Sequence, residues 1–118
     1  MSPEEETQRA EEALRVWWQD RTEAEIVAVV PKAVEYGSNS LINVGRALAR
    51  LQGREVDDEE ATELGCWFNA FQKVERWTDA VLRRERPSDD TIHDTGIYVK
   101  MAQRNRDVGG WPFAEGEA

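Results

Sequence analysis

The fold of the chain is decided by residues 57–110, DDEEATELGCWFNAFQKVERWTDAVLRRERPSDDTIHDTGIYVKMAQRNRDVGG. The first part of this stretch carries apolar residues at intervals of three and four: Leu64, Trp67, Phe68, Phe71, Val74, Trp77 and Val81. Such spacing predicts an amphipathic helix, which Arg86-Pro87 ends because proline cannot continue a helix. Ser88 predicts the cap of a second helix, and Gly109 predicts its end. The stretch therefore predicts two helices joined at Pro87.

Helix signals also fill the residues before this stretch. Residues 2–5 (SPEE) are typical of a helix start and predict a helix to about residue 18. Residues 22–25 (TEAE) repeat the pattern and predict another helix to about residue 36, kinked at Pro31. A third helix is expected after residues 38–40, with Leu41, Val44, Leu48 and Leu51 on one face. Because strand signals are nearly absent, we expect an all-α fold, a four- or five-helix bundle that forms oligomers.

The length and composition fit one domain. The chain has 118 residues, of which 40% are hydrophobic, which is enough to form a core at this size. We expect a single helical domain over residues 1–113, with its core in residues 22–108. Residues 114–118 have little pattern and are expected to be a flexible tail.

The charge and the cysteine count bear on partners and location. The formal net charge is −9, which argues against general nucleic-acid binding and against docking on anionic lipid, because both need clustered basic residues. No apolar run approaches the ~20 residues of a membrane span, and the acidic N-terminus is unlike a signal peptide. The single cysteine, Cys66, excludes a disulfide framework and a cysteine-based zinc site. We therefore expect a cytoplasmic protein without nucleic-acid or membrane partners.

Two aspartates fall where the second helix of the hairpin should face its neighbours. At about 100° per residue, Asp90 and Asp94 share a stripe with Ile97 and Met101. Buried carboxylates need a cation, a donor or water nearby, and helical bundles use facing carboxylates to hold divalent metals. Oxygen ligands of this kind suit Mg²⁺ or Mn²⁺. The alternative is that Asp90 only favours the helix dipole and that Asp94 pairs with an arginine such as Arg83.

A second acidic pair, Glu60 and Glu63, lies on the apolar side of the preceding helix, with the E-x-x-E spacing common among metal ligands. A continuous helix over residues 64–86 would place this pair over ~30 Å from the two aspartates. The two pairs would then meet only if the helix breaks or if another subunit supplies one of them. Glu75 and Asp79 are closer across the hairpin, but solvent-exposed salt bridges are the role we expect for them.

The order of short motifs along the chain resembles that of a known family. Lys73 and Arg76 form a K-x-x-R step, and Asp90, Asp94 and Tyr98 form D-x-x-x-D-x-x-x-Y. Upstream lie Tyr36-Gly37-Ser38 and residues 43–49, NVGRALA. This order resembles the MazG-like, all-α nucleoside triphosphate pyrophosphohydrolases, in particular the phage branch associated with nucleotide modification. The resemblance covers residues 34–108.

The resemblance implies a reaction and roles for these residues. An activated water would attack between the α and β phosphates of a (d)NTP with the help of Mg²⁺ (or Mn²⁺), releasing a (d)NMP and pyrophosphate. Catalytic and metal-binding roles are implied for Asp90 and Asp94, with Glu60 and Glu63 as further metal candidates. Contacts to the substrate are implied for the remaining motif residues, namely Lys73, Arg76 and Tyr98.

The family resemblance also bears on assembly and on setting. It implies a homodimer or a larger homo-oligomer that binds nucleotides in phage or bacterial nucleotide metabolism, in the host cytoplasm if the protein is phage-encoded. The chain departs from the E-x-x-E and E-x-x-D motifs of the better-known enzymes, because Thr91 stands where a glutamate would complete the second motif.

A non-catalytic protein is the alternative to an enzyme. Trp17 and Trp18 are adjacent and cannot both face one core, so we expect one of them to meet another subunit or a ligand. The alternative function is a helical interaction factor, such as a phage protein that binds a host partner. Carboxylates gathered around one point would favour the enzyme, whereas acids dispersed and individually paired with basic residues would favour the binding protein.

Overall fold

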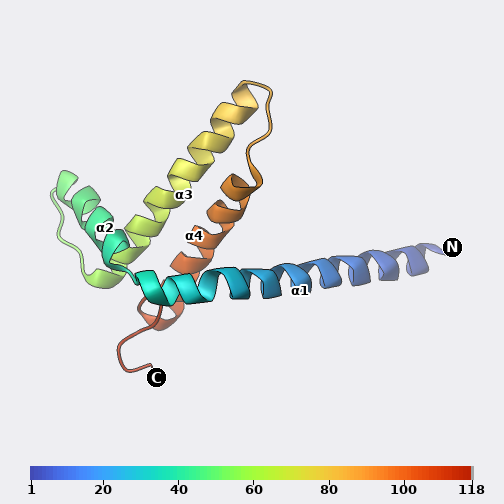
Figure 1. Cartoon of the computed structure of the whole chain (residues 1–118), viewed down its shortest axis with the longest axis horizontal. Helices are drawn as coiled ribbons and strands as arrows, with labels where there is room; N and C mark the ends of the chain where they lie inside the picture. The colour runs from blue at the N-terminus through green and yellow to red at the C-terminus, as the bar shows by residue number, and fades with distance from the viewer. Residues whose placement is uncertain (118) are drawn as a thin grey trace. The chain divides into compact units, whose positions relative to one another are not determined.

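The computed structural model describes residues 1–117 and is all-helical, without a strand among those residues. Four helices follow one another: α1 (Pro3–Tyr36), α2 (Asn39–Leu51), α3 (Asp58–Leu82) and α4 (Asp89–Val108). Figure 1 shows α3 and α4 running side by side in opposite directions, with α2 beside the start of α3. The all-α prediction is confirmed.

The hairpin helices begin and end where local capping chemistry dictates. At the start of α3, the carboxylate of Asp57 accepts a hydrogen bond of 2.8 Å from the backbone N–H of Glu60. The Ser88 hydroxyl accepts one of 3.2 Å from the N–H of Thr91 at the start of α4. Gly109 ends α4 at φ 81°, and its N–H bonds to the Asn105 carbonyl. These caps satisfy backbone groups that a helix leaves unpaired, which confirms the predicted starts and the Gly109 stop.

The chain divides into two compact units, Met1–Tyr36 and the residues from Gly37 onward. The first unit is α1 alone. The predicted break between two helices near residue 20 is wrong, because residues 19–21 (QDR) contain no glycine or proline and the helix continues through them. An ion pair of 3.9 Å between Arg21 and Glu25 spans the expected junction. Pro31 also lies inside the continuous helix.

No residue of α1 is buried. The rings of Trp17 and Trp18 contact each other edge to face at 5.4 Å, and their side chains are 55% and 54% exposed. Ile26, Val27, Val30 and Val34 are exposed as well. The helix therefore carries exposed apolar side chains along its length.

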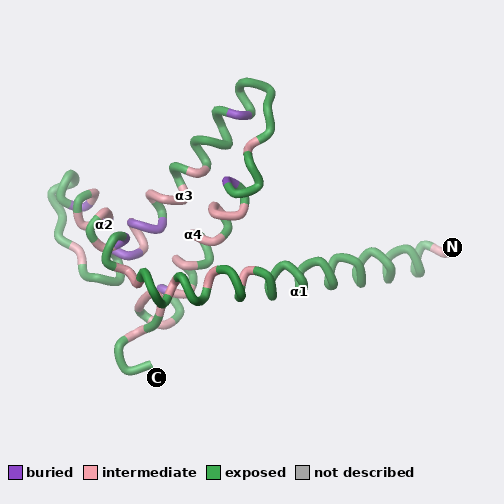
Figure 2. Tube along the Cα trace, viewed as in Figure 1, coloured by how far each residue is buried: buried purple, intermediate pink, exposed green. Residues whose placement is uncertain are grey.

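In the second unit, two glycines set the contact between α2 and α3. A Cβ added to Gly45 would lie 1.8 Å from the carbonyl oxygen of Ala61, and one added to Gly65 would lie 2.2 Å from that of Leu41. Side chains larger than hydrogen cannot occupy these positions, so the two backbones touch directly. Figure 2 shows buried residues at this contact, and most of them are small.

The prediction that the large apolar residues of α3 face the core is wrong. Trp67, Phe71 and Trp77 were expected to form the core, but they are 55%, 45% and 37% exposed. The buried positions of α3 are instead Ala61, Thr62, Gly65, Cys66 and Ala80. The reason is that close helix contact selects small residues, which leaves the large aromatics on the outer side. The Trp67 and Phe71 rings stack on each other at 5.5 Å.

No helix within residues 1–117 combines the length and the apolar character that crossing a membrane requires.

Candidate functional site

The hairpin brings the K-x-x-R helix against the D-x-x-x-D-x-x-x-Y helix. The Nζ of Lys73 on α3 lies 3.2 Å from Oδ2 of Asp94 on α4. The two side chains keep only 21% and 39% of their exposure, so the ion pair is partly shielded from water. The alternative that paired Asp94 with an arginine such as Arg83 is wrong in the residue, because Lys73 is the partner and Arg83 pairs with Glu85.

Tyr98 lies one helical turn after Asp94 and belongs to the same neighbourhood. Burial raises the pKa of its phenol, and the negative charge of Asp94 raises the pKa further, with a smaller effect from Cys66. The raised pKa keeps the Tyr98 hydroxyl protonated as a hydrogen-bond donor at neutral pH. We call Lys73, Asp94 and Tyr98 the hairpin cluster.

Two residues of the same motifs stay outside the hairpin cluster. Asp90 lies in the first turn of α4 and is exposed, so the expectation that it faces inward is wrong. In the first turn of α4 its charge favours the helix dipole, which is the alternative role expected for it. Arg76 is exposed one turn after Lys73, and within residues 1–117 neither its guanidinium nor the Asp90 carboxylate has an ion pair.

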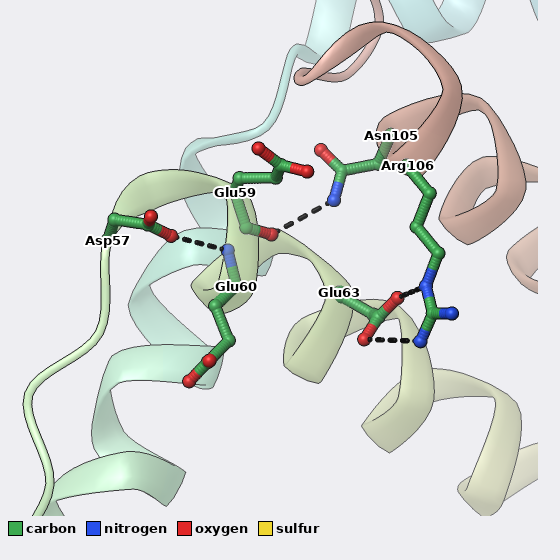
Figure 3. Close-up of polar contacts among 6 residues, drawn as sticks. All are labelled: Asp57, Glu59, Glu60, Glu63, Asn105 and Arg106. Carbon is green, nitrogen blue, oxygen red and sulfur yellow. Dashed lines mark hydrogen bonds and ion pairs between the residues drawn. The ribbon is translucent and has the colours of Figure 1, made fainter.

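Glu60 and Glu63 are held by different arginines. Arg54 lies 3.2 Å from the Glu60 carboxylate, whereas the guanidinium of Arg106 binds the Glu63 carboxylate through two nitrogens. The hydrogen bonds from Arg106 lower the pKa of Glu63 below its ordinary value against the opposing effect of burial. Figure 3 shows the two glutamates pointing to different sides of α3.

The two acidic pairs are separated, though by less than the sequence suggested. Asp94 lies opposite Lys73, which is about 15 Å of helix rise from Glu63 rather than over 30 Å. Among residues 1–117, no three side chains of His, Cys, Asp or Glu come together in a group that could hold a metal ion. Mg²⁺ in proteins is often held by one or two carboxylates plus substrate phosphates, and Asp90 and Asp94, one turn apart, fit that smaller donor set.

A groove of about 610 Å³ lies between α3 and α4. It is within the size range of small-molecule sites. Trp67 and Tyr98 line it, and the ion pair of Glu63 with Arg106 lies within the same lining. Trp67 and Arg106 were not predicted from the sequence as residues that line a groove. Arg106 follows Tyr98 by eight residues and so lies on the same helix face, which is the signal that could have identified it.

Cys66 lines the groove but is 1% exposed. Burial raises the pKa of its thiol to about 11, and the charge of Glu63 adds to the effect. The thiol is therefore neutral at physiological pH and unsuited to nucleophilic chemistry. Cys66 is a small core residue.

The chain was compared with protein-family models, with curated proteins and with solved structures, and none of the three comparisons finds a match. The resemblance to the MazG-like family therefore remains an inference from motifs and their spacing.

Proposed function

We propose that this protein is a MazG-like, Mg²⁺-dependent pyrophosphohydrolase that converts a (d)NTP into a (d)NMP and pyrophosphate. The observation that carries the proposal is the 3.2 Å contact between Lys73 and Asp94. It joins the basic motif on α3 to the acidic motif on α4, as a site that binds phosphates beside a metal requires.

The residues of the hairpin cluster have complementary tasks. Without a ligand, Asp94 neutralises Lys73. A triphosphate competes for the Lys73 ammonium, since phosphate oxygens are strong acceptors for cationic donors. The Asp94 carboxylate, released from Lys73, then joins Asp90 in facing the phosphates. Mg²⁺ bound with the triphosphate supplies charge neutralisation and an activated water.

Neighbouring side chains complete the proposed nucleotide site. Arg76, exposed one turn after Lys73, offers a guanidinium to a second phosphate. The Tyr98 hydroxyl, held protonated by its raised pKa, donates a hydrogen bond. Trp67 lines the groove about 9 Å of helix rise from Lys73, where its indole offers a flat surface to the base.

A panel of canonical and modified (d)NTPs with Mg²⁺ tests the proposal. Pyrophosphate release should be measured for the wild type, for Asp94→Asn and for Asp107→Asn, which removes one exposed carboxylate elsewhere on α4. We expect turnover of at least one nucleotide by the wild type and by Asp107→Asn, with a loss of about 100-fold or more in Asp94→Asn. If no nucleotide is turned over and none raises the melting temperature, the proposal is wrong.

A second candidate is a non-catalytic helical protein that binds a partner protein. This candidate is favoured by acids that are individually paired with basic side chains. Four acids each form an ion pair with a different basic side chain, namely Asp58, Glu60, Glu63 and Asp94. The exposed aromatic side chains of α3 add apolar surface for such a partner. The nucleotide panel separates the two candidates, since this one predicts neither turnover nor a nucleotide-dependent rise in melting temperature.

A further inference from the structure

An acidic pocket of about 340 Å³ adjoins the groove and shares Glu63 and Arg106 with it, at the end of the hairpin away from Asp90 and Asp94. Acids from the start of α3 line it together with Asn105 and Arg106 from the end of α4 (Figure 3). Most of these acids are engaged. The Asp57 carboxylate caps α3, Glu60 pairs with Arg54, and Glu63 pairs with Arg106.

Glu59 is the acid of this pocket whose carboxylate has neither a hydrogen bond nor an ion pair among residues 1–117. Its Oε2 lies 3.7 Å from the place that a Cβ on Gly109 would take, so the carboxylate sits beside the C-terminal end of α4. That end of a helix carries negative partial charge, which opposes the favourable field that Glu59 has in the first turn of α3.

Asn105 gives independent evidence for a ligand at this pocket, because one polar atom of its buried side chain has no partner. The residue is 0% exposed, and its Nδ2 donates a hydrogen bond of 2.9 Å to the backbone carbonyl of Glu59. This bond fixes which end of the amide is nitrogen. The other end, Oδ1, is buried without any hydrogen-bond donor. Figure 3 shows this oxygen on the side of Asn105 that faces the Glu59 carboxylate.

Two oxygen atoms without partners, one of them anionic, thus meet at the negative end of a helix. The basic side chain that lines the same pocket, Arg106, is already bound to Glu63. A buried amide oxygen and a carboxylate cannot satisfy each other, because both are acceptors. A cation bound between them satisfies both.

We propose that Glu59 and Asn105 bind a divalent cation that prefers oxygen ligands, of the class of Ca²⁺, Mg²⁺ and Mn²⁺. One Glu59 carboxylate oxygen and Asn105 Oδ1 are the protein ligands, and water fills the remaining positions. The cation ties the start of α3 to the end of α4. This site is separate from Asp90 and Asp94, which lie near the other end of the hairpin, and it does not depend on nucleotide binding.

Titration with Mn²⁺ alone, followed by electron paramagnetic resonance in the absence of nucleotide, tests the site. We expect one bound ion per chain with a dissociation constant of about 10⁻⁴ to 10⁻³ M, as for sites with few protein ligands, and displacement by Ca²⁺. Glu59→Gln should weaken binding by about tenfold or more, since it removes the anionic ligand. Glu85→Gln removes one carboxylate from the opposite end of the hairpin and should leave binding unchanged.

Two further variants test whether the ion binds here and not at Asp94, and whether a loss of binding comes from misfolding. Asp94→Asn should bind Mn²⁺ alone as the wild type does at this site. Asn105→Ala should also lose the ion, and circular dichroism shows whether this variant folds. If it does not fold, Glu59→Gln still tests the site, because Glu59 is exposed and its substitution does not disturb the core. Absence of Mn²⁺ binding by the wild type up to about 10 mM, or equal binding by wild type and Glu59→Gln, would overturn the proposal.

Discussion

Lys73 on α3 and Asp94 on α4 form an ion pair of 3.2 Å across the helical hairpin. Twenty residues of chain separate them, including the turn at Pro87, so only the antiparallel packing of the two helices brings them together. The pair is partly shielded and is flanked by Tyr98, whose pKa is raised by burial and by Asp94. The proposed phosphate site rests on this contact.

The direct backbone contact between α2 and α3 makes a prediction about stability. Gly65→Ala should destabilise the protein by about 1–3 kcal/mol or more, because the added methyl would meet the Leu41 carbonyl at 2.2 Å and the helices must separate. Urea unfolding followed by circular dichroism measures the change in the free energy of unfolding.

Gly96→Ala is the matched control for this substitution. Gly96 lies inside α4, and a Cβ there would meet nothing within 4 Å. Alanine should therefore stabilise by about 0.5–1 kcal/mol, since glycine is unfavourable in a helix interior. Equal effects of the two substitutions would contradict the close packing of α2 on α3.

The ion pair of Glu63 with Arg106 makes a prediction about pH. The pKa of Glu63 is lowered in the folded state by the hydrogen bonds from Arg106. Its stabilising contribution is therefore present above the ordinary glutamate pKa of about 4.3 and is lost as the pH falls through the lower, folded value. Glu63→Gln should be slightly less stable than the wild type at pH 7, since ion pairs near the surface contribute little, and the difference should shrink in acid.

Urea unfolding of both proteins between about pH 3 and pH 7 measures this difference across the relevant range. Glu75→Gln, which removes an exposed carboxylate of the same helix, is the control. A wild-type advantage that grows on acidification would show that Glu63 is not held as an ionised partner of Arg106.

The exposed tryptophans of α1 make a prediction about assembly. No residue of α1 is buried, and Trp17 and Trp18 are both more than half exposed. We expect the wild type to form a homodimer or a larger homo-oligomer through these side chains, because buried aromatics contribute strongly to interfaces. Light scattering at micromolar concentration should report more than one chain for the wild type and a smaller species for the double variant Trp17→Ala/Trp18→Ala.

Phe113→Ala serves as the control, since it removes an exposed aromatic outside α1. A monomeric wild type would argue against the interface.

The sequence predicted those parts of the fold that depend on local chemistry. Ser88 and Gly109 act within one helical turn, so their capping roles were readable from neighbouring residues. The same reasoning failed at Thr22, because the capping pattern there has no effect when the preceding helix does not end. The exposure of Trp67 could not be predicted either, since it depends on glycines of α2 and α3 selecting another face for close contact.

Only part of the candidate site was predictable, because helical spacing defines a face of one helix but not what that face contacts. Helical spacing placed Asp94 on an inward face, and the hairpin brings the motif residue Lys73 into contact with it. Asp90 lies on the same stripe but is exposed in the first turn of α4, and a helical wheel contains no information about which part of a face the neighbouring helix covers. The partner of Glu63, Arg106, is 43 residues away in sequence, and no local pattern identifies such a pairing.

The central claim is that Lys73 and Asp94 form the phosphate site. Calorimetric titration with a (d)NTP analogue that carries a methylene group between the α and β phosphates measures binding without hydrolysis. The analogue is that of a nucleotide which the wild type turns over in the panel of (d)NTPs. The titration is run with and without Mg²⁺ on the wild type, Lys73→Met and Asp94→Asn.

Lys73→Met should weaken binding by about tenfold or more under both conditions, because it removes a charged phosphate contact. Asp94→Asn should bind at least as tightly as the wild type without Mg²⁺, because Lys73 loses its competing partner, yet should lose the gain in affinity that Mg²⁺ gives. Unchanged affinity in Lys73→Met, or the same response to Mg²⁺ in Asp94→Asn as in the wild type, would contradict the account.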